Sequence, residues 1–318
     1  MIKTALTGIA ALFLFTACGD KEEAPPLKIL NAGPIPKAAV DEFSGQNAFD
    51  HIEKLTSFGP RPPQSEGYQK SLKYLEDTLQ ELGWKTKRSS FQTLTPVGRV
   101  SFTNLLARYL PEGEPDWATS TTFIVSGHLD TKPYSDKVFL GVNDSGSSTG
   151  VMLELARILS KHQEAALNIE LVFFDGEEAM GEKMEFRKDG LYGSSNYAKK
   201  LRKRKTKPSL GIVIDLVGDP KVPLFIGSDS HPGAIAQSRI ATTALGLDQA
   251  VSFPGTSILD DHVPLMAFAN IPVLHIIGDF QNMDYWHTAE DTLDKITPGA
   301  LENAGKLTLQ VIHQITTK

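Results

Sequence analysis

Short apolar runs that lead directly to an acidic residue or a histidine recur along the chain, at residues 124–130, 169–178, 211–215 and 272–287. Runs of this length that are rich in Ile, Val and Phe are typical of buried strands. Segments with helical spacing of apolar residues lie between and around them, at residues 49–55, 72–82, 147–160, 234–245 and 298–315. The alternation predicts an α/β fold, a three-layer α/β/α sandwich with a mostly parallel, mixed central sheet.

The polar residues that follow these runs are expected to meet at one place. In a parallel sheet the functional groups gather beyond the carboxyl ends of the strands. His128, the pair Glu177 and Glu178, Asp215 and His287 all occupy such positions. A glycine-rich turn at residues 141–146 contributes a further acid, Asp144, just before a predicted helix.

These residue types suit a zinc site. Zinc accepts imidazole nitrogen and carboxylate oxygen, and a catalytic zinc keeps one position open. Asp144, Glu178 and His287 would supply three ligands, and Glu177 would remain free as a general acid/base. Asp130 would orient the His128 imidazole. Each motif alone is typical of an ordinary turn, but their order on successive strand ends favours a shared site.

The N-terminus reads as a targeting segment. Lys3 precedes an apolar stretch at residues 5–15 that is too short to span a bilayer, and Ala17 stands directly before Cys18. This arrangement resembles a bacterial lipobox, although a plain secretory signal with an incidental cysteine is the alternative. We therefore expect an exported protein, lipid-anchored through Cys18 to a bacterial membrane, in the periplasm or at the cell surface.

The predicted organisation is a signal peptide at residues 1–18, a tether at residues 19–45 and one catalytic domain at residues 46–318. Cys18 is the only cysteine, so the mature domain has no internal disulfide, no cysteine metal ligand and no cysteine nucleophile. The formal net charge of −6 argues against a nucleic-acid partner, because phosphate contacts need a basic face.

The order of the acids and histidines resembles that of the co-catalytic zinc aminopeptidases, and finer details resemble the glutaminyl cyclases, a branch of that superfamily. The segments that carry the finer resemblance are residues 58–63, 95–98, 101–105, 144, 152–157, 174–179, 191–194, 215–218, 260–264, 272–275 and 286–288.

The resemblance implies a role for each matching residue. Asp144, Glu178 and His287 match the zinc ligands of the cyclases, and Glu177 matches their proton-transfer residue. Asp215 and Asp260 match two acids in its hydrogen-bond network, Trp286 matches a pocket tryptophan, and Phe280 is expected to line the pocket. The implied reaction converts an N-terminal glutamine of a peptide or protein to 5-oxoproline and releases ammonia.

Departures from the cyclase pattern bear on substrate affinity and side-chain preference more than on the metal site. Lys183 or Phe186 stands where a second pocket tryptophan is expected, and Gln64 replaces a glycine. A di-zinc aminopeptidase is the alternative, with His128 and Asp215 on a second ion, so the ligands alone allow one zinc or two. A non-catalytic peptide-binding lipoprotein is less suitable, because binding alone needs no free base such as Glu177.

Overall fold

A computed structural model describes residue 27, residue 29 and residues 32–253 and 255–317. The predicted signal peptide with Cys18 lies outside the described residues, as does most of the tether up to residue 31. None of the described helices combines the length and apolar character that a membrane crossing requires.

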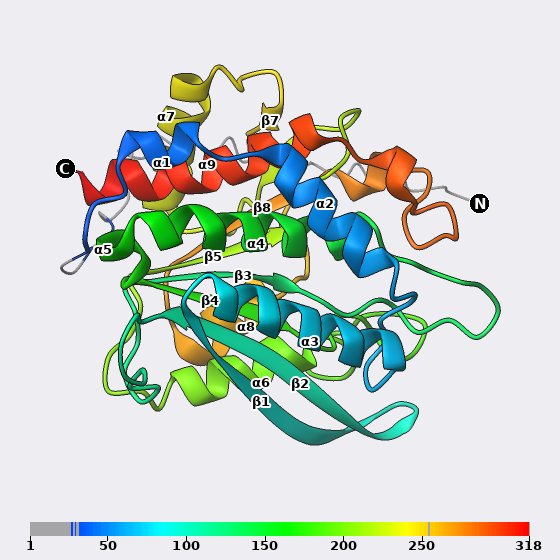
Figure 1. Cartoon of the computed structure of the whole chain (residues 1–318). Coiled ribbons are helices and arrows are strands. Elements are labelled where there is room, and N and C mark those ends of the chain that lie inside the picture. The colour runs from blue at the N-terminus through cyan, green and yellow to red at the C-terminus, as the bar shows by residue number, and fades with distance from the viewer. Residues whose placement is uncertain (1–26, 28, 30–31, 254, 318) are drawn as a thin grey trace, which may run out of the picture.

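The centre of the described chain is a single eight-stranded sheet (Figure 1). In spatial order its strands are β1 (Trp84–Thr95), β2 (Gly98–Tyr109), β4 (Ile169–Phe174), β3 (Phe123–His128), β5 (Leu210–Asp215), β8 (Val273–Gly278), β6 (Leu224–Ile226) and β7 (Val251–Ser252). The neighbours β3–β4, β3–β5, β5–β8 and β6–β7 are parallel, and β1–β2, β2–β4 and β6–β8 are antiparallel. The predicted mixed, mostly parallel sheet is confirmed.

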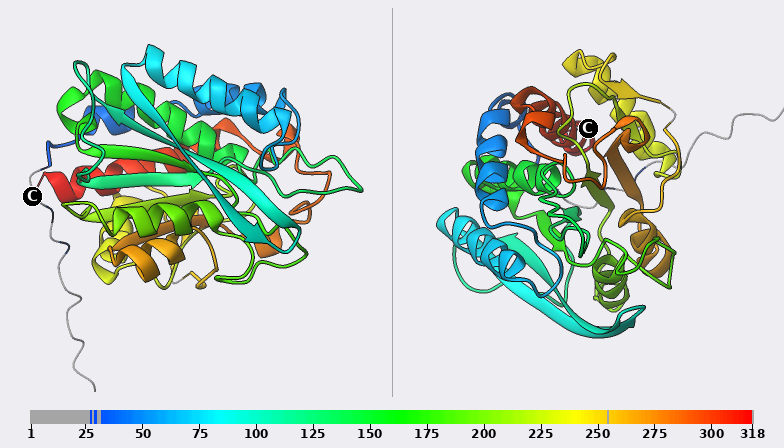
Figure 2. Two further views of the ribbon diagram at one scale, coloured as in Figure 1. Left: turned by 90° about the horizontal axis from the view of Figure 1, so that it is seen from below. Right: turned by 90° about the vertical axis from the view of Figure 1, so that its right-hand side faces the viewer.

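Helices cover both faces of this sheet. They are α1 (Lys37–Asp41), α2 (Gly45–Thr56), α3 (Glu66–Glu81), α4 (Gly146–Lys161), α5 (Gln163–Ala166), α6 (Tyr192–Leu201), α7 (Pro232–Leu245), α8 (His262–Pro264) and α9 (Pro298–Thr316), with short turns η1 (Leu265–Ala269), η2 (Phe280–Asn282) and η3 (Leu293–Lys295). The helices α2, α3, α4 and α9 lie on one side of the sheet, and α6 lies on the other (Figure 2).

The buried strands explain the two layers of helices. Successive side chains of a strand point to opposite faces of the sheet. In β3, Val125 packs into the core beneath α4 and α9, whereas its neighbour Ile124 packs with Tyr197 and Leu201 of α6. Strands that are apolar on both faces can be buried only between two layers of helices. The predicted three-layer sandwich is confirmed.

The folded domain begins earlier than the predicted boundary at residue 46. Ile35, Val40 and Phe43 are buried, and the Ile35 carbonyl lies 2.6 Å from Nδ1 of His313 in α9. Residues 35–43 show no apolar periodicity in the sequence because α1 is only five residues long. Their contact in α9, His313, lies almost 280 residues further along the chain. Part of the predicted tether therefore belongs to the domain.

Candidate active site

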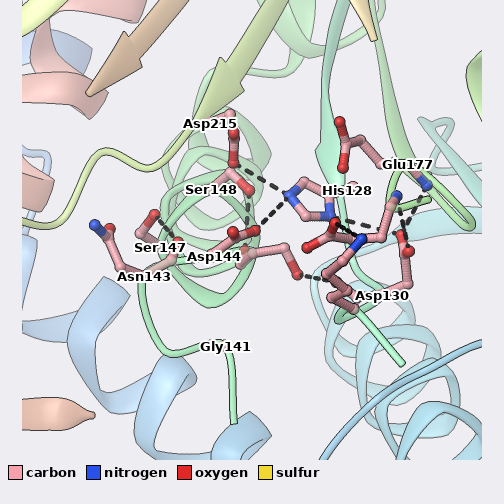
Figure 3. Close-up of polar contacts among 12 residues, drawn as sticks. His128, Asp130, Gly141, Asn143, Asp144, Ser147, Ser148, Glu177 and Asp215 are labelled. Atoms are coloured by element: carbon pink, nitrogen blue, oxygen red, sulfur yellow. Dashed lines mark hydrogen bonds and ion pairs between the residues drawn. The ribbon is translucent and has the colours of Figure 1, made fainter. Parts of the chain in front are cut away.

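The strand ends bring the predicted polar residues to one edge of the sheet (Figure 3). His128 is the last residue of β3 and Asp215 the last of β5, while Glu177 and Glu178 follow β4. Asp144 lies two residues before α4 and faces His128. Because β4, β3 and β5 pair in parallel, their carboxyl ends lie side by side. Residues that are far apart in the sequence therefore come close together.

Asp144, Glu178 and His287 form a compact group. Nε2 of His287 lies 3.3 Å from Oδ2 of Asp144 and 3.0 Å from Oε1 of Glu178. One ligand atom from each residue lies within 4.8 Å of the others, so a single metal ion fits between them. The donor set of two carboxylates and one imidazole is one that zinc accepts.

His128 forms a second group with the same aspartate. Its Nε2 lies 3.2 Å from Oδ1 of Asp144 and 3.2 Å from Oδ1 of Asp215 (Figure 3). These three residues also satisfy the geometry of a metal site. Asp144 is therefore shared by two adjoining groups of ligands, which is the arrangement that a two-ion site requires.

The charges of this cluster call for a cation. Asp144, Glu178 and Asp215 are all buried, and buried carboxylates at close range need compensation. Burial raises the pKa of Asp215 to about 7. Burial alone would lower the pKa of His287, but its hydrogen bonds to Asp144 and Glu178 raise the pKa to about 9. A bound metal would supply positive charge to these carboxylates and would compete with protons for the histidine nitrogens.

Asp130 lies beside His128, as expected, with its Oδ1 3.6 Å from Nδ1 of the imidazole, which is within ion-pair range but longer than a hydrogen bond. Its carboxylate also accepts from the backbone N–H groups of Glu177 at 3.2 Å and Glu178 at 3.3 Å (Figure 3). Asp130 thus fixes the backbone that presents both glutamates.

Asp291 fixes the other side of the site and was missed in the sequence. Its two carboxylate oxygens accept from the backbone N–H groups of Asn143 at 2.8 Å and Asp144 at 3.1 Å. Asp291 stands in a polar loop four residues after His287, and nothing in the sequence of this loop indicates that an acid there is buried. Only the folded chain places it beneath the turn that carries Asp144.

Arg61 is a second organising residue of this turn. Its guanidinium is fully buried and donates to the carbonyls of Leu129, Leu140 and Gly141 at 2.8–3.0 Å. These bonds join the end of β3 to the turn before α4. Arg61 belongs to the segment 58–63 on which the family resemblance rests, but the sequence did not reveal its role.

His287 is held in an uncommon backbone conformation. Its φ of 57° lies in the left-handed region, which is rare for residues other than glycine. Nζ of Lys137 donates to the His287 carbonyl at 2.7 Å, and the ring of Phe139 lies against the imidazole edge-on at 5.9 Å. Trp286 stacks on the imidazole, with ring centroids 4.0 Å apart. These contacts fix the direction of the imidazole.

A pocket of about 410 Å³ opens above the cluster, a size that suits a small ligand. Glu177 and Asp260 line it together with the predicted aromatic residues Trp286 and Phe280, whose rings lie 4.6 Å apart. Lys183 also lines the pocket. Phe186, the alternative to Lys183 at the position of the expected second tryptophan, packs on Phe268 instead, with ring centroids 5.7 Å apart.

Asp260 belongs to a histidine cluster behind the pocket. Its Oδ2 lies 2.6 Å from Nε2 of the buried His275, which therefore contacts a residue of the pocket. His262 stacks on His275, and its Nε2 lies 3.1 Å from Oδ2 of Asp229. Asp260, His262 and His275 also satisfy the geometry of a metal site.

Known proteins match this chain in sequence and in fold. The model of peptidase family M28 matches residues 104–312. A glutaminyl-peptide cyclotransferase-like protein of Bos taurus is 31% identical, over 86% of this chain and 78% of its own length.

Two solved structures superpose over most of the chain. A glutaminyl cyclase of an Acidobacteriales bacterium is 30% identical with a TM-score of 0.74, over 93% of this chain and 99% of its own. A Zn-dependent exopeptidase of Parabacteroides distasonis is 25% identical with a TM-score of 0.76, over 86% and 99%. The chain thus belongs to peptidase family M28 and, within it, to the glutaminyl cyclase family.

Proposed function

We propose that this chain is a zinc-dependent glutaminyl-peptide cyclotransferase that cyclises the N-terminal glutamine of peptides and proteins and releases ammonia. The observation that carries the proposal is Glu177, a buried carboxyl group that lines the pocket directly beside the ligand group of Asp144, Glu178 and His287. The names of the relatives support the same activity.

In this proposal Asp144, Glu178 and His287 hold one zinc ion. When bound, zinc would polarise the carbonyl oxygen of the substrate's side-chain amide. Asp144, Glu178 and His287 would supply three ligands, and a catalytic zinc keeps a further position open for substrate. Trp286 and Phe280 would pack against the apolar part of the glutamine side chain and keep water away from it.

Glu177 would move the proton. The α-amino nitrogen attacks the γ-carboxamide carbon of the same residue and forms the ring C–N bond, and Glu177 accepts a proton from this amine. Glu177 then gives that proton to the amide nitrogen as its C–N bond breaks, so the leaving group is ammonia. Burial raises the pKa of Glu177 well above the usual carboxyl value, with Glu178 and Asp260 adding to the rise and His128 opposing it. A raised pKa suits a group that must both accept and donate.

Asp215 and Asp260 would support Glu177 from the pocket wall. Both carboxyl groups are buried and line the same pocket as Glu177. Asp260 is anchored by His275 and Asp215 by His128. Fixed acids on this wall would hold the substrate's amino group within reach of Glu177.

A di-zinc aminopeptidase is the second candidate, because His128, Asp144 and Asp215 form their own potential metal group. Product analysis separates the two activities. Purified protein with zinc should convert Gln-peptides to the cyclic product with one ammonia per turnover, and it should release no free leucine from Leu-peptides. Release of leucine, with no ammonia from Gln-peptides, would establish the peptidase instead.

The contact between Lys137 and the His287 carbonyl gives a prediction about metal affinity. Lys137→Met should weaken zinc binding by about 10-fold, because partners that orient a ligand contribute 10- to 100-fold to affinity. Competition with a chromophoric chelator measures this directly. Lys70→Met, at an exposed lysine of α3, is the matched control and should bind zinc like the wild type. Equal affinity in the Lys137 variant would show that the carbonyl contact does not position the ligand.

We also propose that the chain is exported and anchored to a membrane through a lipid on Cys18. The support is the N-terminal sequence alone, with Lys3, the apolar stretch at residues 5–15 and Ala17 before the cysteine. Fractionation of cells that express wild type and Cys18→Ser tests the anchor. The wild type should sediment with membranes and the variant should not; equal distribution would contradict lipidation.

A further inference from the structure

A second groove lies beside the catalytic pocket, and the same loop borders both. Residues 182–184 of this loop line the pocket, whereas Arg187, Lys188 and Gly190 line the groove. Residues 91–94 of β1 and several residues of α6 complete the groove, which has a volume of about 420 Å³. Figure 1 shows α6 running next to the β1–β2 hairpin. We call this site the basic groove, after Arg187, Lys188 and Lys199.

The basic groove carries uncompensated positive charge. None of its lining residues is acidic. Within the described part of the chain, neither Arg187 nor Lys199 forms an ion pair with a carboxylate; Lys188 pairs with Glu185. The guanidinium of Arg187 lies 5.3 Å and Nζ of Lys199 lies 4.9 Å from the ring centroid of Phe268. Two cations on one aromatic surface, neither paired with a carboxylate, give the groove local positive charge in a chain of net charge −6.

The groove is tied to the catalytic residue through the backbone. The N–H of Leu191 donates to the Glu177 carbonyl at 2.8 Å, and the N–H of Tyr192 donates to the Gly176 carbonyl at 2.7 Å. Tyr192 lines the groove, and the Glu177 side chain lines the pocket. Met184 lines the pocket and Arg187 lines the groove, and three residues of chain span at most about 11 Å, so an extended peptide can bridge the two backbones in three or four residues.

We propose that the basic groove binds acidic side chains of the peptide substrate a few residues after the N-terminal glutamine. The inference rests on the proposed cyclase activity and adds a substrate class to it. Carboxylates of Asp or Glu would pair with Arg187 and Lys199, while apolar parts of the peptide would contact Phe91 and Phe268. The chain therefore prefers acidic peptides to basic ones of the same length.

The test compares three substrates: the dipeptide Gln-Ala, and two heptapeptides that begin with Gln-Ala-Gly and continue with four Glu or four Lys. At low salt the acidic heptapeptide should have a kcat/KM about 5- to 10-fold above the basic one, and the ratio should fall towards one in 0.5 M NaCl. The variant Arg187→Gln/Lys199→Gln should abolish the preference and leave Gln-Ala turnover unchanged. Lys54→Gln, at an exposed lysine of α2 on the opposite side of the sheet, removes one positive charge far from the groove. This control variant should keep the preference for the acidic heptapeptide.

Each outcome has a separate meaning. An unchanged ratio in the double variant, or no preference in the wild type, would overturn the basic groove as a substrate site. If the double variant instead loses only binding to phosphatidylglycerol vesicles, the groove is a lipid-facing surface and the inference is wrong. Failure of the wild type to cyclise Gln-Ala would refute the proposed function itself, independently of the groove.

Discussion

Replacing Glu177 with Gln should lower kcat for the cyclisation of a Gln-peptide by about 10²- to 10⁴-fold, while the protein keeps its zinc. The carboxamide has the shape of the carboxyl group but cannot take a proton from the attacking amine. Glu177 is only 7% exposed and its backbone N–H is held by Asp130, so water cannot readily replace its side chain. Initial rates of ammonia release, together with zinc content by atomic absorption, measure both parts of the prediction.

Glu182→Gln is the matched control. Glu182 lines the same pocket but is exposed to solvent, so its replacement should change kcat less than about 3-fold. Retention of most activity by Glu177→Gln would remove Glu177 from the proton transfer. Equal losses in the two variants would indicate an effect of charge in the pocket rather than a specific role.

Asp144→Asn should reduce zinc affinity by more than about 100-fold, because even an orienting partner of a ligand contributes 10- to 100-fold. Among the described residues, Asp144 is the one carboxylate common to the two adjoining ligand groups, that of Glu178 and His287 and that of His128 and Asp215. Burial alone would raise its pKa, but hydrogen bonds from His128 and His287 hold the pKa below the usual value, so Asp144 is available as an anionic ligand. Asparagine offers a neutral oxygen in its place.

Thermal unfolding with and without zinc gives a second measure of the Asp144 variant. A ligand that binds only the folded state stabilises it by about 2.7 kcal/mol at 100 times its Kd. Zinc should therefore raise the Tm of the wild type and of Asp136→Asn, an exposed acid near the site, but not that of Asp144→Asn. A full zinc-induced rise in the Asp144 variant would place the metal elsewhere.

The parts of the fold with strong apolar patterns were predictable from the sequence. The buried strands β3, β4, β5 and β8 and the long helices α4 and α9 were expected near their observed positions, because burial on both faces leaves a continuous apolar run. The strand β1 was missed because it is half-exposed and mostly polar. Helix α6 was missed because most of its residues are small or polar and its apolar face is short.

The residues that converge in the site were predictable from the sequence, but the residues that hold them in place were not. The strand ends indicated that the acids and histidines would meet, since parallel strands place their carboxyl ends together. The supporting contacts of Asp291, Arg61 and Lys137 were not visible, because each depends on a backbone group of another segment rather than on a sequence pattern. The pairing of Asp229 with His262 joins residues 33 positions apart and gave no signal either.

Anomalous X-ray diffraction at the zinc edge, from crystals of the zinc-loaded protein, tests the central claim most directly. One strong peak is expected about 2.0–2.2 Å from carboxylate oxygens of Asp144 and Glu178 and a ring nitrogen of His287. A peak held instead by Asp260, His262 and His275, or two equal peaks on either side of Asp144, would contradict the single catalytic zinc.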